Sequence, residues 1–290
     1  MLALLALLAA VADAQAAVSV IDDAGRTVTL ERPAKRVVTL SPHAGELVAA
    51  AGGLDLLVGV GEHSHYPEAL QHLPRVGDAQ RMDLERVLLL HPDLVVVWSS
   101  GNTSPLVQRL LALVPAVFFS EPRQLEDIPA NLRRLGQLVG RAETAEAVAR
   151  DFESRLADLA QRYAGQTPVR VFHQVWRRPL ITLSDAHMAG AVLRLCGGVG
   201  IFVGLQGLSP VVSEEAVLAA DPQVIIIGSR DAEDPDLQSW RRWPQLAAVR
   251  LGGLVAIDPD ELHQATPRIL NGAQAVCDAL SRVRQRLGGR

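Results

Sequence analysis

The sequence predicts an α/β protein built from two doubly wound lobes that are joined by one long, rigid helix, with a ligand cleft between the lobes. Buried-strand patterns alternate with helix patterns in both halves of the chain, residues 125–163 contain no strand pattern, and one segment occurs twice. The length of 290 residues also suits two domains of ordinary size better than one. We expect lobes at 17–140 and 167–290 and a connecting helix at 141–166.

The repeated segment runs from Asp83 to Val97 and again, without a gap, from Ser213 to Ile227. Each copy begins with a residue that favours the helix N-cap, reaches a proline that ends the helix, and finishes in an apolar run typical of a buried parallel strand. Each also places one glutamate, Glu85 or Glu215, in the first helical turn. Acids there complement the helix dipole, but two matched acids could also dock on two basic groups of a two-fold symmetric partner. The residues alone leave these two interpretations level.

The connecting segment is predicted to be helical because apolar residues recur at helical spacing between Ala142 and Tyr163. The flanking lobes contain shorter elements. An edge hairpin is expected over Ala17–Leu30, a strand over Leu254–Ile257, one short helix over Trp240–Val249 and a terminal helix from Pro267 to Leu287. Ligands of such sheets bind where the carboxyl ends of the strands meet.

Residues 1–16 differ from the rest of the chain. Met1–Ala12 is almost entirely Leu, Ala and Val, and Ala14-Gln15-Ala16 follows it as a small-x-small sequence typical of a cleaved secretion signal. The stretch is too short for a transmembrane helix, and no cysteine follows it to accept a lipid. We therefore expect a signal peptide at 1–16 and a soluble, exported protein that begins near Ala17.

The composition limits the function. A hydrophobic content of 49% favours packed cores over disorder, and a net charge of −4 without a basic block argues against nucleic acid as a partner. The chain has two cysteines, Cys196 and Cys277. In an oxidising compartment an even pair favours one disulfide, and two buried free thiols are the alternative.

Enzyme motifs are scarce. The chain has no nucleophile elbow and no phosphate-binding loop, and Ser41 and Ser184, which follow strands, are interpreted as helix caps. A secreted metal-dependent enzyme is a remote alternative, because histidines at strand ends could bind zinc or manganese although their spacing matches no known ligand motif. These histidines are His43, His63, His65 and His263.

Aromatic residues occur where a cleft is expected. Tyr66, Trp98 and Trp176 each follow a predicted strand, and aromatic faces there suit a large, flat, partly apolar ligand. Tyr66 could instead be a phenolate ligand to haem iron. Core packing explains Trp240 and Phe118 better.

Short motifs in a fixed order cover nearly the whole chain after the leader. They are Val38-Thr39-Leu40-Ser41-Pro42, His65-Tyr66-Pro67, Asp83-Leu84-Glu85-Arg86-Val87 through Pro92-Asp93-Leu94, Trp98 with Ser100-Gly101-Asn102, Leu195-Cys196-Gly197-Gly198, Val212-Ser213 with Glu215-Ala216-Val217-Leu218, and Thr266-Pro267-Arg268-Ile269 leading to Cys277. This ordered set resembles the periplasmic substrate-binding proteins of ABC importers that have a single connecting helix. Within them it is most similar to the vitamin B12-binding branch.

The resemblance implies a monomeric carrier that holds cobalamin or a related corrinoid between its lobes, needs no cofactor of its own and performs no catalysis. It also implies little closure on the ligand, a disulfide between Cys196 and Cys277, and salt bridges from Glu85 and Glu215 to arginines of the two membrane subunits of an ABC transporter. The ligand-binding residues that we expect are Pro42, Tyr66, Trp98, Gly101, Trp176 and His263.

The chain departs from the vitamin B12-binding pattern at two single positions and in one short run, Glu261-Leu262-His263-Gln264, which replaces a more aromatic and charged run just before Thr266. Ala79 and Ser209 stand where a well-known B12 binder has tryptophan. A haem or ferric-siderophore carrier of the same fold is therefore the alternative, and a haem carrier would use Tyr66 with His263 opposite.

Overall fold

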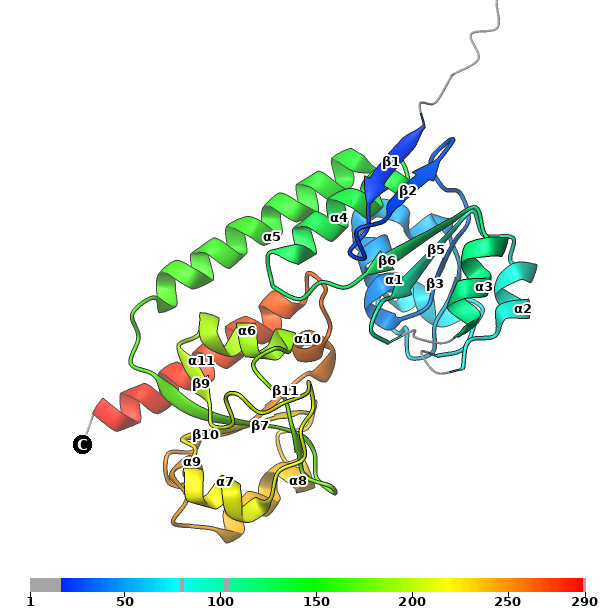
Figure 1. Cartoon of the computed structure of the whole chain (residues 1–290). Coiled ribbons are helices and arrows are strands. Elements are labelled where there is room, and N and C mark those ends of the chain that lie inside the picture. The colour runs from blue at the N-terminus through cyan, green and yellow to red at the C-terminus, as the bar shows by residue number, and fades with distance from the viewer. Residues whose placement is uncertain (1–16, 79–80, 102–104, 289–290) are drawn as a thin grey trace, which may run out of the picture.

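The computed structural model describes residues 17–78, 81–101 and 105–288, and these form two α/β lobes that are joined by a long helix (Figure 1). The predicted fold class is confirmed. The expected signal peptide at 1–16, and Ala79, lie outside the described residues.

The N-terminal lobe is built on a four-stranded parallel sheet in the order β4-β3-β5-β6. Its strands are β3 (Val37–Thr39), β4 (Leu57–Val60), β5 (Leu94–Trp98) and β6 (Ala116–Ser120), and an antiparallel hairpin, β1 (Val18–Ile21) and β2 (Thr27–Leu30), precedes them. Its helices are α1 (Pro42–Val48), α2 (Leu84–Leu89), α3 (Pro105–Leu113) and α4 (Asp127–Leu138), with short helical turns at η1 (Ala49–Gly53), η2 (Leu54–Leu56) and η3 (Glu68–His72).

The C-terminal lobe has a five-stranded sheet in the order β11-β10-β7-β8, with β9 also paired to β7. Only β8 runs antiparallel. The strands are β7 (Val169–Trp176), β8 (Ile181–Thr182), β9 (Gly198–Gly200), β10 (Val224–Gly228) and β11 (Leu254–Ile257). The helices are α6 (Met188–Leu195), α7 (Glu214–Ala220), α8 (Pro235–Gln238), α9 (Ala247–Arg250), α10 (Pro259–His263) and α11 (Ile269–Gly288), with a short turn at η4 (Ser239–Arg242).

Helix α5 (Ala142–Tyr163) connects the lobes, as predicted, and lies against α4 at one end and α11 at the other (Figure 1). Its buried side chains, among them Phe152 and Leu159, join apolar residues of both lobes into one continuous core. The α4–α5 contact requires a glycine, because a Cβ at Gly136 would lie 2.2 Å from the Cβ of Ala145. Helices packed this closely and anchored in two lobes form a stiff connection.

An ion pair also joins the lobes directly. Arg268, just before α11, donates from Nε to Glu46 Oε1 at 2.8 Å and from Nη2 to Glu46 Oε2 at 2.7 Å. Glu46 lies on α1 and is only 3% exposed. The ring of Tyr66 covers the Arg268 guanidinium at 3.8 Å, so the N-terminal lobe encloses this arginine from two sides.

The predicted disulfide is confirmed. Cys196, at the end of α6, is bonded to Cys277 in the middle of α11, and both residues are fully buried. The bond therefore fastens the terminal helix to the C-terminal lobe.

Two local predictions were wrong. Trp240–Val249 is not one helix: Pro244 follows η4 and prevents the chain from continuing as a helix before α9. Ser184 is not a helix cap, because α6 begins at Met188 and His187 caps it. Strand β9 at Gly198–Gly200, which pairs with β7 directly after α6, was not predicted.

Candidate functional site: a cleft between the lobes

A cavity of about 560 Å³ lies between the two lobes. The N-terminal lobe lines it with Pro42, His43, Trp98, Ser100, Glu121, Pro122 and Arg123, and the C-terminal lobe lines it with Ala186, His187, Met188, Leu208, His263, Gln264 and Ala265. The N-terminal group follows directly on β3, β5 and β6, or ends β5. Parallel strands present their carboxyl ends at one edge of a sheet, which explains why segments far apart in sequence meet here.

Trp98 supplies the aromatic surface of the N-terminal wall and is 37% exposed. Its ring lies against Gly101, where a Cβ would come within 1.9 Å of the indole Cε3. His43 meets the same ring edge-on, with centroids 5.7 Å apart. Gly101 thus belongs to the site because it makes room for the indole.

The imidazole of His43 is held neutral in this wall. Its Nδ1 lies 3.2 Å from Ser41 Oγ, and its Nε2 is buried without a hydrogen-bond partner among the described residues. Burial lowers the pKa of His43 to about 4, although the charge of Asp23 opposes the shift. The N-terminal wall therefore brings no histidine cation to the cleft at neutral pH.

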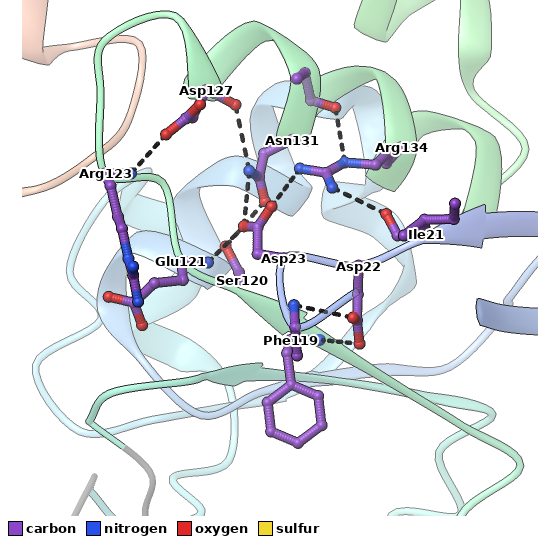
Figure 2. A network of polar contacts seen from close by, with 12 residues as sticks. Ile21, Asp22, Asp23, Phe119, Ser120, Glu121, Arg123, Asp127, Asn131 and Arg134 are labelled. Carbon is purple, nitrogen blue, oxygen red and sulfur yellow. Dashed lines mark hydrogen bonds and ion pairs between the residues drawn. The ribbon is translucent and has the colours of Figure 1, made fainter. Parts of the chain in front are cut away.

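The N-terminal hairpin positions the rim of the cleft (Figure 2). Asp23, in the hairpin turn, accepts hydrogen bonds from Glu121 N at 2.5 Å and Asn131 Nδ2 at 3.0 Å, and it pairs with Arg134 at 2.6 Å. The Glu121 carboxylate in turn accepts from Ser100 N at 2.7 Å and Ser100 Oγ at 2.9 Å. The loops after β5 and β6 are therefore tied to one another and to the hairpin.

Three histidines cluster at the opposite wall: His187 and His263 line the cavity, and His173 is buried behind them. His173 lies on β7, His187 caps α6, and His263 ends α10. The Nε2 atoms of His173 and His263 are 3.0 Å apart, and the rings of His187 and His263 meet edge-on with centroids 6.2 Å apart. Gly228 leaves room for this group, since a Cβ there would lie 2.8 Å from His263 Cε1.

These three imidazoles are also neutral. Burial lowers the pKa of each, and the neighbouring imidazoles contribute for His173 and His263. The pKa of His263 falls to about 4, despite the opposing charge of Asp260. Within residues 17–78, 81–101 and 105–288, no group of three or more His, Cys, Asp or Glu side chains is arranged to hold a metal ion.

The structure brings only some of the predicted ligand residues to the cavity. Pro42, Trp98 and His263 line it, and Gly101 supports Trp98. Tyr66 is 49% exposed but stacks on Arg268, and Trp176 is 61% exposed and donates from Nε1 to Arg178 O at 3.0 Å. Neither of these two aromatic residues is among those that line the cavity.

Sequence reasoning missed His187, Glu121 and Gln264. His187 could have been found as a helix start, since it precedes a run of helix-forming residues after a loop. No local signal indicates that Glu121 reaches the cleft, because the Asp23 side chain that fixes its backbone is 98 residues away in the chain.

The two matched helices lie away from this cavity. Asp83 caps α2 by accepting from Arg86 N at 2.9 Å, and Ser213 caps α7 by accepting from Ala216 N at 3.1 Å. Glu85 and Glu215 are exposed in the first turns, and the structure pairs neither with any described cation.

Two α/β lobes, a stiff connecting helix and a cavity between the lobes are the architecture of a bilobal binding protein. The chain belongs to the periplasmic binding protein family, whose model matches residues 37–261. None of the described helices is long and apolar enough to cross a membrane.

Named relatives agree with this class. The chain is 37% identical to the vitamin B12-binding protein of Vibrio cholerae serotype O1 over 249 residues, which cover 86% of this chain and 90% of the relative. It is 35% identical to the vitamin B12-binding protein of Yersinia pestis over 251 residues, covering 86% and 88%.

Solved structures give the same result. The crystal structure of the periplasmic vitamin B12-binding protein BtuF of Vibrio cholerae superposes with a TM-score of 0.81 at 36% identity, covering 87% of this chain and 98% of that one. A periplasmic haem-binding protein of Pseudomonas aeruginosa superposes with a TM-score of 0.73 at 29% identity, covering 85% and 92%.

Proposed function

We propose that this protein is a soluble periplasmic carrier that captures cobalamin or a related corrinoid in the interlobe cleft and delivers it to an ABC importer, without performing chemistry on it. The observation that carries the proposal is the cavity between Trp98 and the histidine wall, in a chain that is 37% identical to a vitamin B12-binding protein. Apolar residues from both lobes, such as Pro42, Met188 and Leu208, line this cavity beside polar groups. Such a lining suits a large ligand that is apolar over its ring and polar at its edge.

The haem alternative is less well supported by the geometry. Tyr66 is engaged by Arg268, whose guanidinium lies 3.8 Å from the ring. The Nε2 atom of His263 lies 3.0 Å from that of His173, and the Cε1 edge of its ring faces Gly228. Of the two side chains that would hold haem iron, only His263 lines the cavity.

We further propose lobe boundaries at 17–140 and 167–290, with the connector at 141–166, and a monomeric state. The connector boundaries are supported by α5, which runs from Ala142 to Tyr163. Both lobes bury their cores against this helix within one chain.

Docking on the transporter is proposed through Glu85 and Glu215. Both are exposed first-turn acids at equivalent positions of the two lobes. We expect Glu85→Lys with Glu215→Lys to abolish stimulation of the permease in proteoliposomes while cyanocobalamin affinity is unchanged. Glu143→Lys, which reverses an exposed first-turn acid on α5, is the matched control. Full stimulation by the double variant would contradict the docking proposal.

The ligand assignment is tested by calorimetric titration with cyanocobalamin, haemin and a ferric siderophore, combined with visible spectra. The proposal predicts saturable binding of cyanocobalamin at one site per chain. No heat with cyanocobalamin and a shifted Soret band with haemin would overturn it in favour of a haem carrier.

A further inference from the structure

His187 presents one nitrogen to the helix that it caps and the other to the cleft. Its Nδ1 accepts a hydrogen bond from Ala189 N at 3.1 Å at the start of α6. The ring also lines the interlobe cavity. No described group of the protein forms a hydrogen bond with Nε2, and this atom is not fully buried.

The helix cap fixes the tautomer of this ring. A backbone N–H can only donate, so Nδ1 must carry a lone pair rather than a proton. Burial lowers the pKa of His187, which keeps the ring neutral near pH 7. A neutral imidazole has one N–H, and in His187 it must therefore be on Nε2.

The ring orientation is fixed as well. His263 meets His187 edge-on with centroids 6.2 Å apart, and His263 is itself held by the 3.0 Å contact with His173 on β7. Gly228 accommodates the Cε1 edge of His263. Imidazoles from β7, α10 and α6 thus support one another, and the Nε2–H of His187 is oriented before any ligand arrives.

We propose that His187 Nε2–H is a ligand-binding hydrogen-bond donor that selects a ligand with an acceptor oxygen opposite the C-terminal wall. This inference rests on the proposed function. The side-chain amides at the edge of a corrin ring supply such acceptors, and we assign the contact to one of these amide carbonyls rather than to the phosphate of the nucleotide loop. An apolar ligand of the same shape would leave the donor desolvated and unpaired, which weakens binding.

The substitution His187→Asn separates the two roles of this residue. Asparagine is a strong helix N-cap, so α6 keeps its cap, but its amide is too short to occupy the position of Nε2. We expect the variant to fold with an unchanged melting temperature and to bind cyanocobalamin roughly 3- to 10-fold more weakly, the loss of one hydrogen bond. His72→Asn, at an exposed position outside the cavity, is the matched control and should bind as the wild type does.

Dicyanocobinamide, which lacks the nucleotide loop and its phosphate, distinguishes the acceptors. The proposal predicts the same loss of affinity for this ligand as for cyanocobalamin. A loss confined to cyanocobalamin would overturn the amide assignment, and equal affinity of wild type and His187→Asn for both ligands would overturn the role of His187. Failure of the wild type to bind any corrinoid would instead refute the proposed function.

The tautomer is tested without a ligand by long-range ¹H–¹⁵N correlation spectra of the imidazole rings. We expect a protonated Nε2 and an unprotonated Nδ1 for His187 near pH 7, and a shift of the Nε2 resonance when cyanocobalamin is added. A proton on Nδ1 would overturn the inference whatever the binding data show.

Discussion

The two copies of the repeated segment fold alike but are fastened to their lobes differently. Helices α2 and α7 are both capped by a side chain. A left-handed residue follows each helix just before a proline: His91 (φ 44°) after α2 and Asp221 (φ 42°) after α7. Leu84 opens α2, whereas Glu214 opens α7 at the equivalent position. The backbone plan is therefore shared, and the difference lies in side chains.

Glu214 is used inside its own lobe. It pairs with Arg177 at 3.0 Å and with Arg242, and it accepts a hydrogen bond from Trp243 Nε1 at 3.1 Å. The matched acid beside it, Glu215, remains exposed, as Glu85 does on α2. The comparison teaches that Glu214, which differs between the copies, stabilises its own lobe, whereas the matched acids Glu85 and Glu215 stay exposed.

The largest expected effect concerns the disulfide, which only the C-terminal lobe contains. Replacing both Cys196 and Cys277 by Ser removes a cross-link over a sequence separation of 81 residues. Chain entropy predicts a loss of about 4 kcal/mol in the free energy of unfolding. Hydrogen exchange should show a larger loss of protection in α6 and α11 than in β3 and β5. Equal loss of protection in both lobes would mean that the disulfide stabilises the N-terminal lobe as much as the C-terminal lobe.

The next largest effect concerns the ion pair between Glu46 and Arg268, which joins the two lobes. Glu46→Gln leaves Arg268 without its buried partner, and we expect a loss of about 3 kcal/mol in the free energy of unfolding. Denaturant unfolding should then separate into two transitions. Asp55→Asn, which removes the exposed pair with Arg141, is the control and should change stability by less than about 0.5 kcal/mol. A single, unshifted transition for Glu46→Gln would show that α5 alone couples the lobes.

A smaller loss in the free energy of unfolding is expected from breaking the ion pairs of Glu214 on α7. Glu214→Gln should cost about 2 kcal/mol because Arg177 and Arg242 lose their carboxylate. Burial alone would raise the pKa of Glu214, but hydrogen bonds from Arg242 and Arg177 outweigh it and hold this pKa below its ordinary value of 4.5.

The pH dependence of the stability follows from the lowered pKa of Glu214. The stabilisation by Glu214 is complete above pH 4.5 and is lost as the pH falls through the lower folded-state pKa. The stability difference between wild type and Glu214→Gln, measured by urea unfolding, should therefore shrink on acidification below pH 4.5. A difference that stays constant down to pH 2.5 would contradict the ion-pair account.

The smallest effect concerns the left-handed residues that follow the two helices. Glycine adopts this conformation without strain, so His91→Gly should stabilise the protein by about 0.5–1 kcal/mol. Asp221→Gly should not, because the Asp221 carboxylate also accepts a 2.7 Å hydrogen bond from Ala247 N. Thermal unfolding of the two variants checks this, and an equal gain at both sites would mean that the Asp221 bond contributes nothing.

The sequence predicted those parts of the molecule that local periodicity determines. The 22-residue α5, the strand that ends each copy of the repeat and the two capped helices all follow from spacing and capping residues. The disulfide followed from the cysteine count, the expected export and the family resemblance.

The rest of the site depends on contacts between distant segments. Asp23 reaches Glu121 and Arg134 across about a hundred residues, so a hairpin that looks like a simple edge positions the cleft rim. Likewise, His173 and His263 are 90 residues apart. They meet because α10, which carries His263, contacts β10, the neighbour of β7 in the sheet. Tyr66 was placed in the cleft because it follows a strand, but the structure shows it stacked on Arg268.

The central claim is that a corrinoid lies between Trp98 and the histidine wall, and a crystal structure of the protein grown with cyanocobalamin tests it most directly. The account predicts the corrin ring in the interlobe cavity, with Trp98 on one side and His187 Nε2 within hydrogen-bond distance of a side-chain amide oxygen. The hollow of about 700 Å³ beside Pro33 and α5 offers a second place where a ligand could bind. Cyanocobalamin in that hollow, with the interlobe cavity empty, would contradict the account.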